Sequence, residues 1–317
     1  MNAGRTPPLS AWTASRPFLD VPPSNLIDGR AIAEQIHGET IARIQGLKTR
    51  GVQPGLAFVR VGDDPASKVY VGMKERASER LGILSETHLL PATAPEAELL
   101  ALLEKLNTDP RVHGILVQAP LPPRIRAALV YSSVRPEKDV DGFHPLNVGK
   151  LMLGDPSGFA PCTPSGIQQL LVRARVEIAG AETVILGRGD IVGKPMAAIL
   201  MQKAKDANAT VTVCHSRTRD LPAHCRRADI LIAAMGVAGF VKAGMVKPGA
   251  VVIDVGVNRV EDPSARGGSR LVGDVDFAAV QPIASKITPS PGGVGPMTIA
   301  LLMQNTVRAA EMASARN

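Results

Sequence analysis

The chain has 317 residues, of which 45% are hydrophobic, 21% are charged and only 3% are aromatic, and its net charge is +7. This is the composition of a globular protein long enough for two domains. No apolar run approaches the roughly 18 residues of a membrane span. Because the basic residues are scattered and aromatic side chains for base stacking are scarce, we expect no nucleic-acid or membrane partner and favour small anionic ligands.

The three cysteines, Cys162, Cys214 and Cys225, form no CxxC pair, and the six histidines show no metal-ligand spacing. We therefore predict no disulfide framework, no metal site and a reducing, cytoplasmic location. Residues 1–24 contain five prolines and no apolar core of a signal peptide. We predict a disordered extension there, with an organellar presequence as the alternative.

The first half of the chain alternates between helical and strand patterns, which predicts a parallel sheet with helices on its faces. The expected helices are 29–50, 65–82 and 96–107, and the expected strands are 56–61, 83–89 and 112–117. In the third helix the leucines Leu99, Leu100, Leu103 and Leu106 should face inward. Asp64 should cap the second helix, with Pro65 at its first position.

Tyr70 and Lys74 are four residues apart in that second helix, so they share one face. The pair could form half of an active site, or it could be an ordinary amphipathic pair. Gln118 directly follows the third strand, at the sheet edge where ligands collect in α/β folds. The alternative is a surface amide in a proline-rich loop.

Asp139 and Asp141 precede Gly142 in a short polar stretch. Asp before Gly is a common turn former. A carboxylate in such a turn can also accept two hydrogen bonds from the amidine-like edge of a heterocycle.

The second half contains the strongest local motif, a glycine-rich turn over 187–193 between a strand at 183–186 and a helix from Met196 to about Lys203. The GxGxxxG spacing is one residue longer than the usual dinucleotide fingerprint. Such a turn presents N–H groups and a helix N-terminus to a pyrophosphate. Further strands at 209–214, 229–233 and 250–254 predict a Rossmann-type domain, a fold that regulatory nucleotide-binding modules also use.

Ser216 and Arg217 follow the strand 209–214, where an NAD enzyme usually keeps an acidic residue for the ribose 2′-hydroxyl. Together with Arg188 in the glycine turn, they favour NADP over NAD.

Residues 289–296 contain three glycines and three prolines, which excludes both a helix and an interior strand. Glycines there allow the backbone to approach a ligand closely. A rigid interdomain linker is the alternative. Pro296 is expected to open a last apolar helix.

The spacing Tyr70-x-x-x-Lys74 is also the catalytic pattern of short-chain dehydrogenases. In that family the glycine-rich loop precedes the Tyr–Lys pair, whereas here Gly187 follows it by more than a hundred residues. The reversed order rules that family out.

From Ile27 to the C-terminal helix, the chain resembles the bifunctional methylenetetrahydrofolate dehydrogenase/methenyltetrahydrofolate cyclohydrolase family. Long motifs carry the resemblance in the right order. They are Val61-Gly62…Asp64-Pro65-Ala66-Ser67…Tyr70-Val71…Lys74, Ile115-Leu116-Val117-Gln118-x-Pro120-Leu121-Pro122, Lys138-Asp139-Val140-Asp141-Gly142, Pro161-Cys162-Thr163-Pro164-x-Gly166, Ile191-Val192-Gly193-Lys194-Pro195 and Pro291-Gly292-Gly293-Val294-Gly295-Pro296-Met297-Thr298.

The resemblance implies a folate-binding catalytic domain of three α/β layers over 25–145 plus 290–317, to which the C-terminal helix returns. It implies an NADP-binding Rossmann-type domain over 146–289 and a homodimer. The implied reaction is oxidation of 5,10-methylenetetrahydrofolate by NADP, followed in the same cleft by hydrolysis to 10-formyltetrahydrofolate, in one-carbon metabolism and purine biosynthesis.

By position, the resemblance makes Lys74 the catalytic lysine, Gln118 its hydrogen-bonding partner and Tyr70 the ring that packs on the folate. Asp141 would grip the pterin edge. The other implied substrate-binding residues are Pro120, Gly292 and Gly293. The implied cofactor-binding residues are Gly187, Arg188, Gly189, Ile191, Val192, Gly193, Ser216, Arg217, Gly236 and Val257. A lysine can move protons during water addition only if its pKa is pulled towards neutrality.

The chain departs from the family pattern at two positions. Ala119 stands where the family usually has Leu, which loosens the pocket floor beside Gln118. Gly189 stands where the family usually has Ser, which removes a hydroxyl near the cofactor phosphates. A dehydrogenase without cyclohydrolase activity and a non-catalytic nucleotide-binding subunit are the competing functions.

Overall fold

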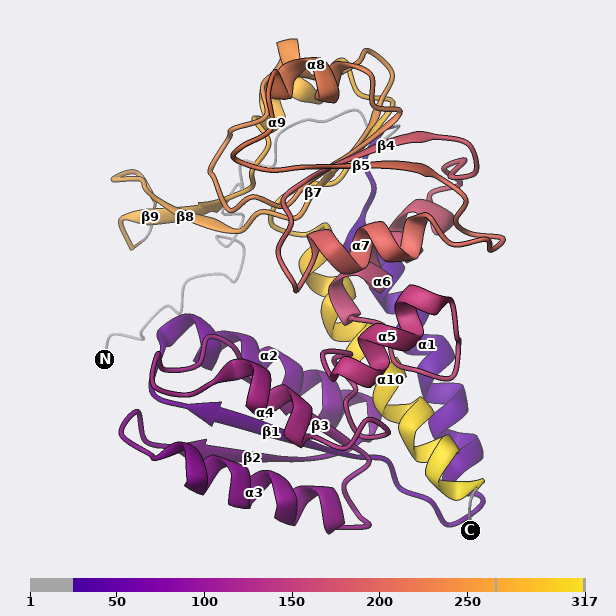
Figure 1. Ribbon diagram of the computed structural model, residues 1–317, viewed down its shortest axis with the longest axis vertical. Coiled ribbons are helices and arrows are strands. Elements are labelled where there is room, and N and C mark those ends of the chain that lie inside the picture. Colours follow the sequence, from indigo (N-terminus) through magenta and orange to yellow (C-terminus); the bar gives the residue numbers. More distant parts are fainter. Residues whose placement is uncertain (1–24, 266, 316–317) are drawn as a thin grey trace, which may run out of the picture.

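The structure is a computed structural model that describes residues 25–265 and 267–315. The extension predicted for residues 1–24 lies outside the described residues. Two α/β units follow one another along the longest axis, and the long helix α10 (Val294–Ser314) runs beside α1 (Gly29–Lys48) from one unit into the other (Figure 1). The predicted two-domain α/β fold, with the C-terminal helix packed on the first domain, is confirmed.

The remaining helices in the described part of the chain are α2 (Pro65–Leu81), α3 (Glu96–Thr108), α4 (Ala127–Ser133), α5 (Pro145–Leu153), α6 (Cys162–Arg173), α7 (Gly193–Leu200), α8 (Leu221–Arg226), the 3₁₀ helix η1 (Ala243–Met245) and α9 (Phe277–Val280). The strands are β1 (Gly55–Val61), β2 (Leu84–Leu90), β3 (Gly114–Val117), β4 (Glu182–Leu186), β5 (Thr210–Cys214), β6 (Ile230–Ala233), β7 (Val251–Asp254), β8 (Asn258–Glu261), β9 (Ser269–Val272) and β10 (Lys286–Ile287).

The first sheet is parallel, with strand order β2-β1-β3. Every residue of the central strand β1 is buried, as expected for a strand covered on both faces. Val59 and Val61 pack with α3 and α4 on one face, whereas Leu56 and Phe58 pack with α1, α2 and α10 on the other. These are the three layers that the sequence predicts.

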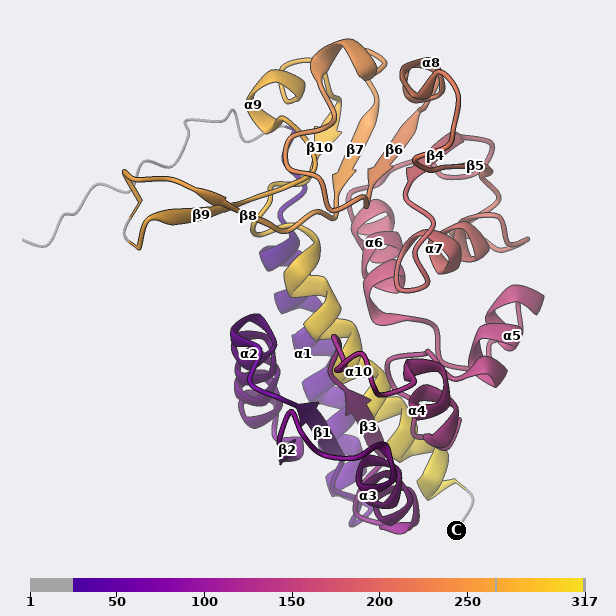
Figure 2. The same ribbon diagram turned by 60° about the vertical axis from the view of Figure 1, so that its left-hand side comes forward.

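The second sheet is parallel as well, with strand order β10-β7-β6-β4-β5 (Figure 2). Strand β5 is added on one side of β4, and β6 and β7 are added on the other, so the strand order reverses between β4 and β6. In doubly wound sheets, ligands bind at the carboxyl ends of the strands at that reversal. The antiparallel hairpin β8–β9 projects away from the sheet.

One apolar core runs through both domains. It joins Phe58 and Leu116 of the first sheet to Ile185, Ile232 and Ile253 of the second, through helices α1, α6, α7 and α10. Among the described residues, no helix is both long enough and apolar enough to cross a membrane.

Local sequence signals explain how α2 begins and ends. The carboxylate of Asp64 accepts a hydrogen bond of 2.7 Å from the backbone N–H of Ser67, and Pro65 occupies the first helical position. Gly82 ends the helix in the left-handed conformation, at φ 79°. Both the start and the end agree with the prediction to within a residue.

Several predicted boundaries are wrong. Helix α7 spans Gly193–Leu200 instead of beginning at Met196. One burial prediction also differs, because Leu100 of α3 is only partly buried. Helix α10 begins at Val294, so Gly295 and Pro296 lie in its first turn. A first-turn residue needs no intrahelical N–H partner, so proline and glycine are tolerated there. The sequence patterns also missed the short elements α4, α5, α8, α9, η1, β8, β9 and β10.

Candidate active site

Helix α2 carries the two residues around which the candidate site is built. Tyr70 and Lys74 lie one turn apart and both line the same cavity. The side chain of Lys74 is almost fully withdrawn from solvent, since the residue is only 7% exposed. The predicted shared face is therefore a face that looks into a cavity.

Gln118 holds the lysine ammonium. Its Oε1 accepts a hydrogen bond of 2.9 Å from Lys74 Nζ, and its Nε2 donates to the carbonyl oxygen of Ala119 at 2.7 Å. The same carbonyl also accepts from the hydroxyl of Ser67 at 3.3 Å. Since both amide atoms of Gln118 are engaged, its orientation is set. The contact that matters at position 119 comes from the backbone, which Ala supplies as well as Leu would.

Asp141 lies in a turn that the neighbouring carboxylate of Asp139 organises. Asp139 is 5% exposed and accepts hydrogen bonds from the backbone N–H groups of Phe143 and His144 and from the side chain of Asn147. Gly142 has a φ of 77°, and a Cβ there would overlap the backbone at Ala160 and Pro161. The two acidic residues thus have different roles. Asp139 stabilises the turn, and Asp141 lines the cavity.

The electrostatics of this cluster favour a lysine able to exchange a proton. Burial lowers the pKa of Lys74, against the opposing attraction of the Asp141 carboxylate. Burial also raises the pKa of the Cys162 thiol well above its usual range. Cys162 is therefore a neutral thiol, and its Sγ donates to the carbonyl oxygen of Val140.

A cavity of about 400 Å³ joins the two halves of the predicted site. This is within the usual range for small-molecule pockets. Its lining comes from both domains: Tyr70, Lys74, Leu116, Val117, Gln118, Ala119, Tyr131, Asp141, Phe143, Thr163, Ile191, Val192, Val255, Val257, Val294, Gly295, Thr298 and Ile299.

The sequence patterns missed an aromatic pair in this cavity. The rings of Tyr131 and Phe143 lie 5.3 Å apart at an interplanar angle of 46°. The chain has only two tyrosines, Tyr70 and Tyr131, and both line the cavity. In a chain so poor in aromatics, the positions of the tyrosines were a usable signal.

The cofactor half of the site is built by backbone packing around the glycine-rich turn. A Cβ at Gly193 would overlap the carbonyl of Gly187, and a Cβ at Gly187 would overlap the carbonyl of Ala234. These contacts bring the turn after β4 against the loop after β6, at the point where the strand order reverses. Helix α7 begins at Gly193 and directs its N-terminus to this crevice, a geometry suited to a dinucleotide pyrophosphate.

Ser216 and Arg217 lie exposed after β5, the strand next to β4. Their turn is held by hydrogen bonds from His215 N–H to Thr218 Oγ1 and from Arg217 N–H to His215 Nδ1. Arg188 is exposed in the neighbouring turn. Gly189 has open space where a side chain would begin, so the family's serine would fit there.

The predicted site residues divide into two groups. Tyr70, Lys74, Gln118 and Asp141 meet Ile191, Val192 and Val257 in the cavity. The others do not line it: Pro120, Gly292, Gly293, Gly187, Arg188, Gly189, Gly193, Ser216, Arg217 and Gly236. Gly293 packs instead against the start of α1, where a Cβ on Gly29 would overlap its carbonyl.

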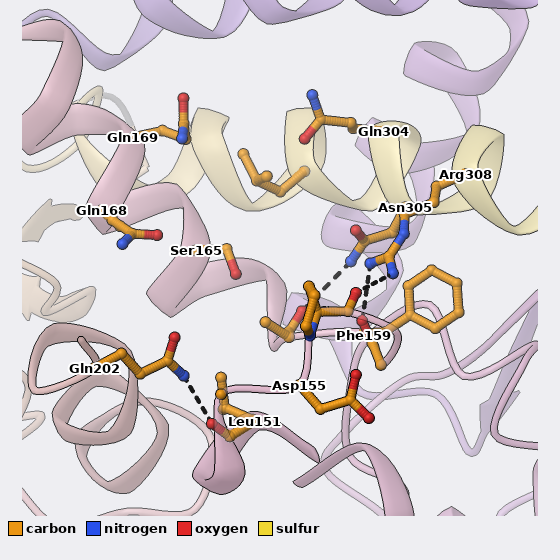
Figure 3. Close-up of a pocket in the computed structure, with 15 residues that line it drawn as sticks. Leu151, Asp155, Phe159, Ser165, Gln168, Gln169, Gln202, Gln304, Asn305 and Arg308 are labelled. Carbon is orange, nitrogen blue, oxygen red and sulfur yellow. Dashed lines mark hydrogen bonds between the residues drawn. The ribbon is translucent and has the colours of Figure 1, made fainter. Parts of the chain in front are cut away.

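A second cavity, of about 320 Å³, is lined by residues of α5, α6 and α10 and contains none of the predicted site residues (Figure 3). Gln168, Gln169, Gln202 and Gln304 contribute amides to its wall. Asn305 connects the two regions, since its Nδ2 donates to the carbonyl oxygen of Val140, next to Asp141, at 2.9 Å.

Two family models match this chain. The catalytic-domain model of tetrahydrofolate dehydrogenase/cyclohydrolase matches residues 27–141, and the NAD(P)-binding-domain model of the same family matches residues 161–314. The chain belongs to the tetrahydrofolate dehydrogenase/cyclohydrolase family. The resemblance seen in the sequence is confirmed, and with it the assignment as a bifunctional dehydrogenase and cyclohydrolase.

Individual relatives agree over nearly the full length. The bifunctional protein FolD 2 of Geobacter sulfurreducens is 54% identical over 294 residues, which are 93% of this chain and 99% of the relative. The crystal structure of the Campylobacter jejuni bifunctional enzyme FolD superimposes with a TM-score of 0.86 at 48% identity, covering 90% of this chain and 98% of that chain. The Trypanosoma brucei enzyme, solved with NADP and an inhibitor, gives a TM-score of 0.88 at 40% identity, covering 94% and 100%.

Proposed function

We propose that this chain oxidises 5,10-methylenetetrahydrofolate with NADP and hydrolyses the product to 10-formyltetrahydrofolate, with both steps in the 400 Å³ cavity. The observation that carries the proposal is the Lys74–Gln118 hydrogen bond in a cavity that both domains line. Bound NADP supplies the hydride acceptor at C4 of its nicotinamide.

The first domain binds and orients the folate. Tyr70 offers a ring for the folate to pack on, and Asp141 accepts hydrogen bonds from the amidine-like edge of the pterin. Tyr131 and Phe143 extend the apolar wall on the same side. Pro120, Gly292 and Gly293 are proposed substrate-binding residues as well, although none of them lines this cavity.

Lys74 handles the proton of the hydrolytic step. Water adds to the methenyl carbon and loses a proton, which leaves a hydroxyl on that carbon. The five-membered ring then opens: the carbon–nitrogen bond breaks, the nitrogen gains a proton, and the hydroxyl gives its own proton to solvent as it becomes the formyl C=O. A lysine with a lowered pKa can take up the first proton and return one to the leaving nitrogen. Gln118 accepts from Lys74 Nζ and aims it, without itself changing its protonation state.

The second domain holds the cofactor. Gly187, Gly189 and Gly193 form the turn that receives the pyrophosphate, and Ile191, Val192 and Val257 provide the apolar side of the nicotinamide pocket. The loop at Gly236 closes the crevice from β6. Arg188, Ser216 and Arg217 are suited to a ribose 2′-phosphate, which makes NADP the preferred cofactor.

The decisive experiment measures both activities in the purified protein. Methylenetetrahydrofolate is supplied with NADP or with NAD, and the methenyl and formyl products are followed separately. We expect oxidation with NADP, little with NAD, and hydrolysis of methenyltetrahydrofolate faster than its spontaneous rate. Accumulation of the methenyl compound without faster hydrolysis would leave only a dehydrogenase, and equal use of NAD would contradict the 2′-phosphate pocket.

The oligomeric state, domain division and compartment belong to the same proposal. We propose domains over 25–145 plus 290–317 and over 146–289, a cytoplasmic location, and a homodimer supplying formyl groups for purine biosynthesis. Light scattering of the purified chain should then give twice the 33.3 kDa mass of one chain. A monomer at micromolar concentration would contradict the dimer.

A further inference from the structure

Two carboxylates lie buried side by side at the carboxyl end of the second sheet. Asp254 is 2% exposed and Asp274 is fully buried. The backbone N–H of Asp274 donates to Asp254 Oδ1 at 2.8 Å, so the two groups share one pocket. Within 25–265 and 267–315, neither carboxylate forms an ion pair with a lysine, arginine or histidine.

N–H groups take the place of a cation. Asp254 accepts from the backbone N–H groups of Gly256, Asp274 and Val275. Asp274 accepts from three consecutive N–H groups, those of Met235, Gly236 and Val237, at 2.6–2.9 Å, and from the side chain of Asn258 at 2.8 Å. Seven N–H donors therefore compensate for the burial of the two carboxylates.

Two glycines make room for the pair. A Cβ on Gly273 would overlap the carboxylate of Asp254, and a Cβ on Gly256 would overlap the carboxylate of Asp274. Burial raises the pKa of Asp254 to about 6, against the stabilising effect of its N–H donors. Burying two carboxylates without a cation costs stability. An apolar pair would leave the seven N–H donors without acceptors, so the carboxylates are what allow these loop backbones to be buried against one another.

The atoms that Asp274 holds belong to the cofactor side of the proposed site. Residues 235–237 follow β6, next to the glycine turn at the strand-order reversal. Asn258 directly follows Val257, and Val255 and Val257 line the cavity. Asp274 therefore ties together the loop after β6 and the segment at Val257, both on the cofactor side of the proposed site, although it lines neither of the two cavities described above.

We propose that Asp274 is a positioning residue for the nicotinamide cofactor: its carboxylate holds the loop at Gly236 and the segment at Val257 in the geometry that receives NADP. Asp254 acts one step further back, since it fixes the backbone of Gly256 and of Asp274 itself. The inference rests on the proposed NADP-dependent function, but not on the roles of Lys74 or Gln118.

The test replaces one carboxylate oxygen with an amide nitrogen. In Asp274→Asn, at least one of the four N–H donors meets another N–H group instead of an acceptor. We expect the Kd for NADP, measured by titration calorimetry, to rise about 10-fold or more, since a hydrogen bond to a charged acceptor contributes enough for such a change. Cyclohydrolase turnover of methenyltetrahydrofolate without NADP should stay within about two-fold, because that step uses only first-domain groups.

Asp276→Asn is the matched control. It makes the same chemical change two residues away, at a carboxylate whose partner is the exposed Lys242. It should leave both NADP binding and cyclohydrolase turnover unchanged. If Asp274→Asn does not fold, Asn258→Ala removes one donor from the same carboxylate and should raise the Kd about three-fold or more.

The outcomes separate the inference from the function on which it rests. Unchanged NADP affinity in Asp274→Asn and Asn258→Ala, or an equal loss of NADP binding and cyclohydrolase turnover, would overturn the positioning role. A wild-type protein that binds NADP yet oxidises no folate would refute the proposed function. The ratio of the Kd for NADP in Asp274→Asn to the wild-type Kd would still decide the role of Asp274.

Discussion

At the residue scale, the site depends on side chains whose partners are far away in sequence. Lys74 and Gln118 are 44 residues apart, yet their side chains form one hydrogen bond of 2.9 Å. The sequence identified both as candidates, from a helix face and from a strand end. The local pattern did not distinguish the role of Asp139 from that of Asp141, because both stand in the same short turn, and only the family resemblance singled out Asp141. The hydrogen bonds of Asp139 with Phe143, His144 and Asn147 make that distinction.

Replacing Lys74 tests the proposed proton transfer. We expect Lys74→Ala to lower cyclohydrolase turnover by roughly 10²–10⁴, the usual contribution of general acid–base catalysis. Lys74→Arg should be equally impaired, because a guanidinium keeps its proton at any pH that the enzyme tolerates. Both variants should bind NADP with the wild-type Kd.

Lys68→Ala is the control for that experiment, because Lys68 lies on the same helix but is exposed. It should keep wild-type cyclohydrolase turnover. A wild-type hydrolysis rate in Lys74→Ala would show that another group moves the proton.

At the element scale, strand order decides where the cofactor site lies. The turn after β4 and the loop after β6 meet because these two strands are neighbours in the sheet, although α7, β5 and α8 lie between them in the chain. The GxGxxxG motif indicated the first of these loops. Nothing local in the sequence indicated that residues 235–237 would be held against it by Asp274.

Gly193→Ala tests the close packing of the glycine turn. The new Cβ would overlap the carbonyl of Gly187, which is backbone and cannot rotate away. We expect the KM for NADP to rise about 10-fold or more while cyclohydrolase turnover stays near the wild-type value. Gly244→Ala is the matched control in the same domain, since an added Cβ there meets no atom within 4 Å. A normal KM in Gly193→Ala would mean that the turn adjusts without affecting the cofactor.

At the scale of the whole molecule, the two domains share one apolar core. Helix α10 packs against both α1 and α6, and Arg43 of α1 forms a bidentate pair with Glu311 near the end of α10. The shared core extends from Phe58 in the first sheet to Ile253 in the second. Each domain therefore has its own sheet and a smaller apolar cluster of its own, and the largest cluster spans both.

The shared core predicts one cooperative unfolding transition. Differential scanning calorimetry of the protein without ligand should give a single peak, with calorimetric and van't Hoff enthalpies that agree for the cooperative unit. Saturating NADP should raise the midpoint temperature without splitting the peak. At a concentration 100 times the Kd, NADP should add about 2.7 kcal/mol to the free energy of unfolding. Two resolved transitions, of which NADP shifts only one, would show that the domains unfold independently.

The sequence alone determined the features that depend on neighbouring residues. Asp64 and Gly82 delimit α2, and the glycine turn predicts a helix N-terminus for a phosphate, because caps and tight turns are made by residues a few positions apart. The ordered family motifs determined the two activities. The tertiary structure decided which of these signals meet: it placed Tyr131 beside Phe143, left Gly292 outside the cavity, and joined the loop after β6 to the start of β8 through Asp274. Those contacts follow from strand order and helix packing across the chain, and no local pattern encodes them.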